Sequence, residues 1–220
     1  MSNPSKADTE TTPDCVPTDS VSMRSYHAAS AGLHPAILNH SLRVYLYAKA
    51  LAEREASTWA LPDNLPLLFA ACIYHDMGTC CTTDNDPQRF EVTGADAAAQ
   101  MLRSQNVAEA DVHEVWVAIA LHTSPHIAER ISSLARLVRV AVLLDFGRPP
   151  AAIPADITTE VNVQATEQMF PRMAIERILG DAVVGQALRR PEKAPMVSWP
   201  GVMLKAKLQD PEWEGVNKAF

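Results

Sequence analysis

LPLLFAACIYHDMG, residues 65–78, is the stretch that decides the fold. It is apolar as far as Tyr74, and a His-Asp pair, His75 and Asp76, follows before Gly78 offers a natural stop for a helix. His75 stands three, four and seven residues after apolar positions, so it continues the buried face of this helix. Since a buried carboxylate without a partner is costly, the stretch predicts a core helix over about residues 64–76 that ends in a polar site.

Helical periodicity and helix-breaking residues organise the rest of the chain in the same way. Pro35 suits the first turn of a helix, Gly147 closes a helical pattern, and a Pro-rich connector occupies residues 148–154. We find no internal repeat and no strand-like alternation. The predicted fold class is therefore all-α. The expected helices begin at about residue 35 and then cover about residues 64–76, 93–104, 108–122, 134–146, 168–189 and 199–208.

The composition describes a chain with enough apolar residues to bury a substantial core. The 220 residues are 47% hydrophobic and 6% aromatic, which suits one helical domain with an extension. The Ser-, Thr- and Pro-rich residues 1–20 predict a disordered N-terminal tail. We expect a core domain over residues 21–150 and a C-terminal helical extension over residues 151–220, which packs on the core or on a second subunit of a homo-oligomer.

Charge and hydropathy exclude several kinds of partner. The formal net charge is −7 and no basic cluster is present, so no nucleic-acid partner is expected. No apolar run approaches the length of a membrane span, and the N-terminal residues lack the apolar segment of a secretory signal. The four cysteines have no CxxC spacing and are expected to be reduced thiols of a cytoplasmic protein; they are Cys15, Cys72, Cys80 and Cys81.

Three further polar residues lie in line with the apolar stripes of other predicted helices. They are His40, His122 and Asp145. A single buried histidine is usually an ordinary hydrogen-bonded core residue. Together with His75 and Asp76, however, these residues bring imidazoles and carboxylates from four helices toward one core. Helical bundles build metal sites from facing side chains of this kind, so the pattern predicts a metal site.

The order of these residues resembles the His…His-Asp…Asp pattern with which the HD superfamily holds its metal. More narrowly, four blocks look like the fungal cyanamide hydratase branch, and the similarity spans about residues 20–210. The blocks are residues 39–47 (NHSLRVYLY), 74–79 (YHDMGT), 89–95 (RFEVTGA) and 118–123 (AIALHT).

The resemblance implies a single HD-domain helical bundle with one divalent metal in its core. Carried over position by position, it implies His40, His75, Asp76 and Asp145 as the ligands. Two imidazole nitrogens and two carboxylate oxygens suit zinc, iron or manganese, and the resemblance to the hydratases favours zinc. A metal with two anionic ligands lowers the pKa of its bound water less than a metal held by three histidines. A neighbouring base or hydrogen-bond acceptor would therefore help to remove a proton from that water.

Three residues near the expected site are candidates for catalysis. We assign His122, Thr123 and Glu91 to substrate and proton handling. The alternative for each is an ordinary structural role: His122 as a polar residue at a helix end, Thr123 as a helix cap and Glu91 as a surface acid. His122 and His126 could also serve a second metal, but Pro125 interrupts the helix that would align them. We therefore interpret His122 as a pocket residue.

Asn39 and Arg43 flank His40 and are assigned to the surroundings of the metal or to the substrate. Arg43 lies nearly on the same helix face as His40. An ion pair of Arg43 with Asp76 or Glu91 is favoured over contact with substrate.

Two enzymatic functions follow from these features. The first is hydration of a small nitrile, cyanamide to urea in the family, by a metal-activated water. The alternative is metal-dependent phosphohydrolysis of a nucleotide or phosphate ester, and a non-catalytic metal-stabilised binding module is a third interpretation. Phosphohydrolysis requires cations for the phosphate oxygens, and the candidates are Arg43, Arg89 and either Arg136 or Arg139.

Overall fold

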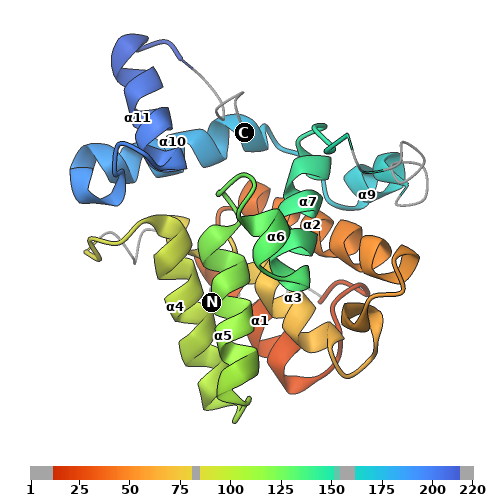
Figure 1. Cartoon of the computed structure of the whole chain (residues 1–220). Coiled ribbons are helices and arrows are strands. Elements are labelled where there is room, and N and C mark those ends of the chain that lie inside the picture. Colours follow the sequence, from red (N-terminus) through yellow and green to blue (C-terminus); the bar gives the residue numbers. More distant parts are fainter. Residues whose placement is uncertain (1–11, 81–84, 152, 154–161, 214–220) are drawn as a thin grey trace, which may run out of the picture.

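A computed structural model describes residues 12–80, 85–151, 153 and 162–213 of the chain (Figure 1). Within these residues the secondary structure is helical throughout and contains no strand, so the predicted all-α class is confirmed. Helix α3 (Leu65–Tyr74) forms the centre, and every residue from Leu67 to Tyr74 is buried. A helix that is apolar on all sides is typical of such a central position.

Five longer helices pack against α3 and make the core of the domain. The five are α1 (Ser20–Gly32), α2 (Pro35–Arg54), α4 (Phe90–Ser104), α5 (Glu109–Leu121) and α7 (Ser133–Asp145). The short helix α6 (Ala128–Ile131) leads into α7. The 3-10 helices η1 (Thr58–Ala60) and η2 (Met77–Thr79) flank α3 in the chain.

Helices α2 and α7 lie side by side and are each started by a local cap. His34 accepts a hydrogen bond from the amide of Ala36 ahead of the predicted first-turn Pro35, and Ser132 accepts one at the start of α7. Both helices bury polar residues toward each other: α2 buries His40, and α7 ends at Asp145. The packing of these two helices therefore sets one half of the polar site.

The C-terminal region forms a further group of helices. The predicted single helix over residues 168–189 is wrong: the chain breaks between α9 (Val163–Met169) and α10 (Ile175–Arg189). Pro171 disfavours a helical Phe170, and Met173 and Ala174 have φ angles of 51° and 56°. Helix α10 packs on α2 and η2, and it also packs on η4 (Pro191–Lys193) and α11 (Trp199–Gln209).

The N-terminal region differs from its prediction. Of the predicted tail, residues 12–20 are described: Val16 is 4% exposed within the core, and Asp19 caps α1 by accepting from the Ser22 amide. Helix α1 has weak amphipathic patterning and was not predicted. Residues 1–11 lie outside the described residues. The division into residues 21–150 and 151–220 stays a prediction. No helix in the described part of the chain is long and apolar enough to cross a membrane.

Two glycines let α4 approach the turn that follows α3. A Cβ atom on Gly78 would lie 1.9 Å from the Phe90 carbonyl oxygen, and one on Gly94 would lie 2.7 Å from the Tyr74 carbonyl oxygen. Backbone therefore packs directly on backbone at this contact. Helix α4 begins at Phe90, one turn before the predicted start at Thr93, and this places Glu91 beside the His-Asp turn.

We expect Gly78→Ala to destabilise the protein, because the added methyl group would overlap backbone atoms that have no free rotation. The free energy of unfolding, measured with urea, should fall by about 1–3 kcal/mol, the usual cost of overpacking. Gly185→Ala is the matched control: its Cβ would meet only the end of the Arg189 side chain, at 3.4 Å, so stability should be unchanged or slightly higher. Equal stability of the two variants would contradict this view of the contact.

Candidate metal centre

Three buried histidines meet at the inner side of α2, α3 and α5. His40 lies within α2, whereas His75 and His122 are the C-terminal caps of α3 and α5. All three residues are at most 2% exposed. The ring of His75 packs edge-on against each of the other two, with centroids 5.0 Å apart in both pairs. Helices that are separate in sequence thus present imidazoles to one place.

Each of these histidines uses Nδ1 on an acceptor of the protein. Nδ1 of His75 and Nδ1 of His122 each lie 2.7 Å from the carbonyl oxygen three residues earlier in the chain. Nδ1 of His40 lies 2.6 Å from Oδ2 of Asp145. Because carbonyl and carboxylate oxygens only accept, these partners assign the proton to Nδ1 and leave the lone pair of each neutral ring on Nε2.

The three Nε2 atoms face Asp76. Nε2 of His40 and Nε2 of His75 lie 3.2 Å apart, and Oδ2 of Asp76 is 3.6 Å from the first and 3.1 Å from the second. Nε2 of His122 lies 3.7 Å from Oδ1. Asp76 is 1% exposed, and its Oδ2 has no hydrogen-bond partner in the described part of the chain. The Nε2 lone pairs of the histidines and the carboxylate oxygen of Asp76 repel one another. This arrangement is unfavourable unless a cation lies between them.

The pKa values of these groups show where positive charge is favoured. Burial alone would raise the pKa of Asp76, but the neighbouring His75 and His40 outweigh it and lower the pKa to about 2. Burial lowers the pKa of His122 to about 3, so this ring stays neutral. Burial acts in the same sense on His75, yet the Asp76 carboxylate raises the pKa of His75 above its ordinary value. A proton and a metal ion would therefore compete for the space beside His75 and Asp76.

The donor set fits a divalent metal. His40, His75 and Asp76 each offer one ligand atom, and these atoms all lie within 4.8 Å of one another. Imidazole nitrogen and carboxylate oxygen are common ligands of zinc, iron and manganese. Metal-binding histidines also usually donate their second N–H to a carbonyl or carboxylate, as both of these histidines do.

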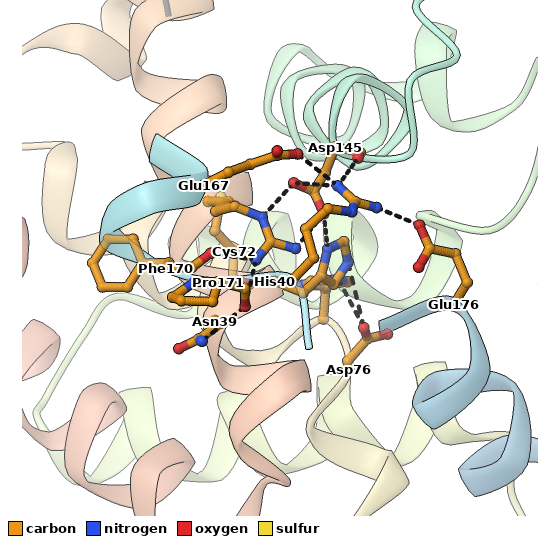
Figure 2. A network of polar contacts seen from close by, with 12 residues as sticks. Asn39, His40, Cys72, Asp76, Asp145, Glu167, Phe170, Pro171 and Glu176 are labelled. Carbon is orange, nitrogen blue, oxygen red and sulfur yellow. Dashed lines mark hydrogen bonds and ion pairs between the residues drawn. The ribbon is translucent and has the colours of Figure 1, made fainter. Parts of the chain in front are cut away.

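Asp145 lies on the other side of His40, which stands between Asp145 and Asp76 (Figure 2). Both of its oxygens are bound by Arg43, from Nε to Oδ1 at 2.6 Å and from Nη2 to Oδ2 at 2.8 Å. Burial opposes ionisation, but Arg43 and His40 hold the pKa of the Asp145 carboxyl below its ordinary range. The geometry therefore makes Asp145 the partner of His40 and does not bring it into the group of three donors.

The predicted acidic partner of Arg43 is wrong. Arg43 pairs with Asp145, and not with Asp76 or Glu91. The reason is its position on α2: it follows His40 by nearly one turn, but it points toward the end of α7, where Asp145 lies. The expected ion pair of Arg43 is present, although its acidic member is Asp145.

Other residues predicted near the site do not join the three donors. Asn39 is half-buried and donates Nδ2 to the Pro171 carbonyl oxygen at 3.0 Å. His126 is exposed and has a φ angle of 66°. Cys80 is buried but does not line the cavity described next, and Cys81 lies outside the described residues.

A small cavity adjoins the three histidines and Asp76. Measured as room for the centre of a water molecule, its volume is about 10 Å³, close to the space for a single water. Thr123 and Arg148 also line it. The rest of the wall is apolar and was not identified from the sequence, because periodicity marks a side chain as buried without naming its neighbours; it consists of Phe90, Val142, Phe146, Leu179 and Trp199.

Thr123 connects the cavity to a buried acid. Its Oγ1 donates to Oε1 of Glu91 at 2.6 Å, and Glu91 is 0% exposed, so the interpretation of Glu91 as a surface acid is excluded. Burial raises the pKa of Glu91, and Arg89 and the Thr123 hydroxyl offset this only in part. Because the hydroxyl proton of Thr123 is used on Glu91, its oxygen is left to accept a hydrogen bond from a group in the cavity.

Comparison with known proteins agrees with this geometry. Residues 37–145 match the HD domain family. Two proteins of Saccharomyces cerevisiae, named cyanamide hydratase DDI2 and cyanamide hydratase DDI3, are each 27% identical to the chain over 151 residues. The matched part is 66% of this chain and spans 63% of the length of each yeast protein.

We expect close to one divalent ion per chain, measured by elemental analysis of the purified protein. His75→Ala and Asp76→Ala should each lose it, since each removes a donor from the group of three. His113→Ala, which removes an exposed histidine of α5, is the control and should keep it. Two ions per chain at full occupancy would contradict a site for one metal.

Proposed function

Because residues 37–145 of this chain match the HD domain family, we propose that the protein is a metal-dependent enzyme that hydrates a small nitrile, with cyanamide as substrate and urea as product. The observation that carries the proposal is the cavity beside the donor group: it is close to the size of one water and walled mainly by apolar side chains. Such a space favours a very small neutral substrate. The names of the two yeast relatives support the same choice.

We propose that His40, His75 and Asp76 hold one divalent ion, with zinc preferred over iron or manganese. When bound, this ion would supply Lewis-acid polarisation and lower the pKa of water. The protein's own contribution is to exclude bulk water from the reacting atoms. Phe90, Phe146 and the other apolar wall residues exclude this water. They come from three parts of the chain: α4, the end of α7 and the C-terminal helices.

The remaining polar groups are suited to handle protons. Hydration joins the water oxygen to the nitrile carbon, and one water proton must leave while the nitrile nitrogen gains one, which gives isourea. The second water proton then moves from oxygen to nitrogen as isourea converts to urea. Neutral His122 can accept a hydrogen bond at Nε2 and thereby orient a water. We propose that Thr123 accepts a proton from the reacting water as it passes its own to Glu91, and that the pair then returns a proton to the nitrogen.

The alternative, phosphohydrolysis, is less well supported. Its four candidate cations all lie beside an acid: Arg43 on Asp145, Arg89 near Glu91, Arg136 on Glu55 and Arg139 on Glu129. Arg148 does line the cavity and is the residue that would have to bind a phosphate oxygen. A phosphoryl transition state carries more negative charge than attack on a neutral nitrile and needs several preorganised donors.

The purified, metal-loaded protein should release urea from cyanamide, in proportion to its metal content. His75→Ala, which removes a donor, should release none, and His113→Ala should match the original protein. Nucleoside monophosphates and bis(p-nitrophenyl) phosphate should be left intact. Phosphate release without urea would reverse the ranking of the two functions, and activity on neither would point to another small carbon–nitrogen substrate.

Thr123→Val tests the proton-handling role, because it keeps the shape of the side chain and removes the hydroxyl group. We expect metal content to be unchanged and kcat to fall by about 10²–10⁴-fold, the usual contribution of a positioned acid or base. His122→Ala should likewise keep its metal and lose turnover. Thr166→Val, at a buried position of α9, is the control and should retain kcat. A Thr123→Val enzyme with normal kcat would remove Thr123 and Glu91 from the mechanism.

A further inference from the structure

The apolar wall of the cavity has an inner and an outer part. Phe90 packs on the ring of His122 with centroids 5.7 Å apart, and Phe146 packs on the ring of His40 at 4.9 Å. Trp199 packs in turn on Phe90 at 5.8 Å. Phe90 is 2% exposed and Trp199 is 9% exposed, so this series of rings runs from the histidines toward the surface. Trp199 is its outer member.

The position of Trp199 is fixed by the way in which α11 begins. Trp199 is the first residue of α11, and the Ser198 side chain caps the helix by accepting from the Gly201 amide at 3.2 Å. The Ser198 hydroxyl donates to the Pro195 carbonyl oxygen at 2.6 Å. A Cβ atom on Gly201 would lie 2.1 Å from the same carbonyl oxygen, so backbone packs directly on backbone here. The start of α11 therefore has little freedom to shift.

Two buried side chains fasten the C-terminal helices to the core. Gln186 of α10 donates Nε2 to the Gly78 carbonyl oxygen, in η2, at 3.0 Å. Lys193 of η4 donates Nζ to the Gln88 carbonyl oxygen, just before α4 begins, at 3.2 Å. Both side chains belong to residues that are at most 3% exposed. These bonds hold the C-terminal helices on the turn after α3 and on the start of α4, so Trp199 is a fixed part of the wall.

The size of the cavity limits the group that a nitrile can carry. A cavity with room for about one water has no space for an alkyl group unless a wall side chain becomes smaller. Phe90 and Phe146 touch the histidines, so shortening either would also disturb the donor group. Trp199 has the largest side chain of the wall and packs on Phe90 from outside. It can therefore limit size without contributing to the donor group.

We propose that Trp199 determines substrate size, because its indole closes the side of the cavity on which the group attached to the nitrile carbon lies. The substrate class is then a nitrile with a substituent no larger than an amino group. N-alkylated cyanamides are excluded by overlap with the indole. Trp199 lies outside residues 37–145, so this selectivity belongs to the C-terminal helices and not to the HD match. The inference rests on the proposed function, since it concerns the same reaction.

The kinetic test compares cyanamide with N,N-dimethylcyanamide, which has the same reacting group and two added methyl groups. One extra carbon in an apolar pocket typically changes kcat/KM by about 10–200-fold. The unaltered protein should prefer cyanamide by at least about 10-fold, and Trp199→Ala should reduce its preference by about 10–200-fold. Trp199→Leu should give an intermediate preference. An unaltered protein without preference, or an unchanged preference in Trp199→Ala, would overturn the proposal.

Trp116→Ala is the matched control. Trp116 is half-buried in a surface groove between α4 and α5, and its indole donates to Oδ1 of Asp96 at 2.7 Å. Its removal deletes an indole and a ring contact area without changing the cavity wall. The preference for cyanamide should therefore equal that of the unaltered protein. An equal loss of preference in Trp116→Ala and Trp199→Ala would show a general effect on stability and overturn the proposal.

A second measurement needs no turnover. Trp199→Ala should leave an apolar space beside Phe90, and engineered apolar spaces in proteins bind benzene or xenon. Benzene should shift the ring-proton NMR signals of Phe90 and His122 in Trp199→Ala, but not in the unaltered protein or in Trp116→Ala. No shift in Trp199→Ala, or an equal shift in all three proteins, would overturn the proposal. If Trp199→Ala does not fold, Trp199→Leu replaces it in both tests, with xenon in place of benzene.

The two measurements separate this inference from the proposed function. Benzene binding only in Trp199→Ala, with no urea formed from cyanamide by the unaltered protein, would refute the choice of substrate and support Trp199 as the size limit of the cavity. Urea release with an unchanged preference in Trp199→Ala would support the reaction and overturn the role of Trp199.

Discussion

The site depends on one constraint: each of its three buried histidines donates its Nδ1 proton to a neighbouring acceptor. Each proton is given to an acceptor that cannot donate, so each neutral ring turns its Nε2 lone pair inward. Two of these acceptors are carbonyl groups in the last turns of α3 and α5, where carbonyl groups outnumber the remaining backbone N–H donors. The ends of these helices thus orient His75 and His122. His40 lies in the middle of α2, where no carbonyl is free, and so it requires a side-chain acceptor, Asp145.

The two buried carboxylates of this site differ in how their charge is balanced. Asp145 is bound by Arg43 and His40, so its charge is satisfied by the protein alone. Asp76 instead lies beside the three histidines, and its Oδ2 lacks a hydrogen-bond partner in the described part of the chain. A carboxylate that the protein leaves unbalanced in its interior is the one that can attract a cation. The same contrast explains why two aspartates on inward helix faces need not have the same role.

The sequence predicted α2, α3, α5 and α7 and their inward faces well, because a period of 3.6 residues records burial directly. It placed His40, His75, Asp76 and His122 correctly in one core. It could not predict which neighbour each inward residue meets, since that depends on how α2 and α7 cross; hence the wrong acidic partner for Arg43. Burial of Glu91 was missed for a related reason: the close approach of α4, allowed by Gly78 and Gly94, is a backbone contact without a hydrophobic signal.

The part of the chain that matches the HD family and the part that follows it contribute different groups to the site. The three donors lie within residues 37–145, whereas Phe146, Leu179 and Trp199 of the cavity wall lie after them. An apolar wall decides which molecules enter, and the donor group decides what can be done to them. The C-terminal region both closes the cavity and, through Phe170 and Arg172, holds the pair of Arg43 and Asp145. Changes in this region would therefore alter both the cavity wall and the surroundings of His40, and under the proposed function they would affect substrate choice and metal binding together.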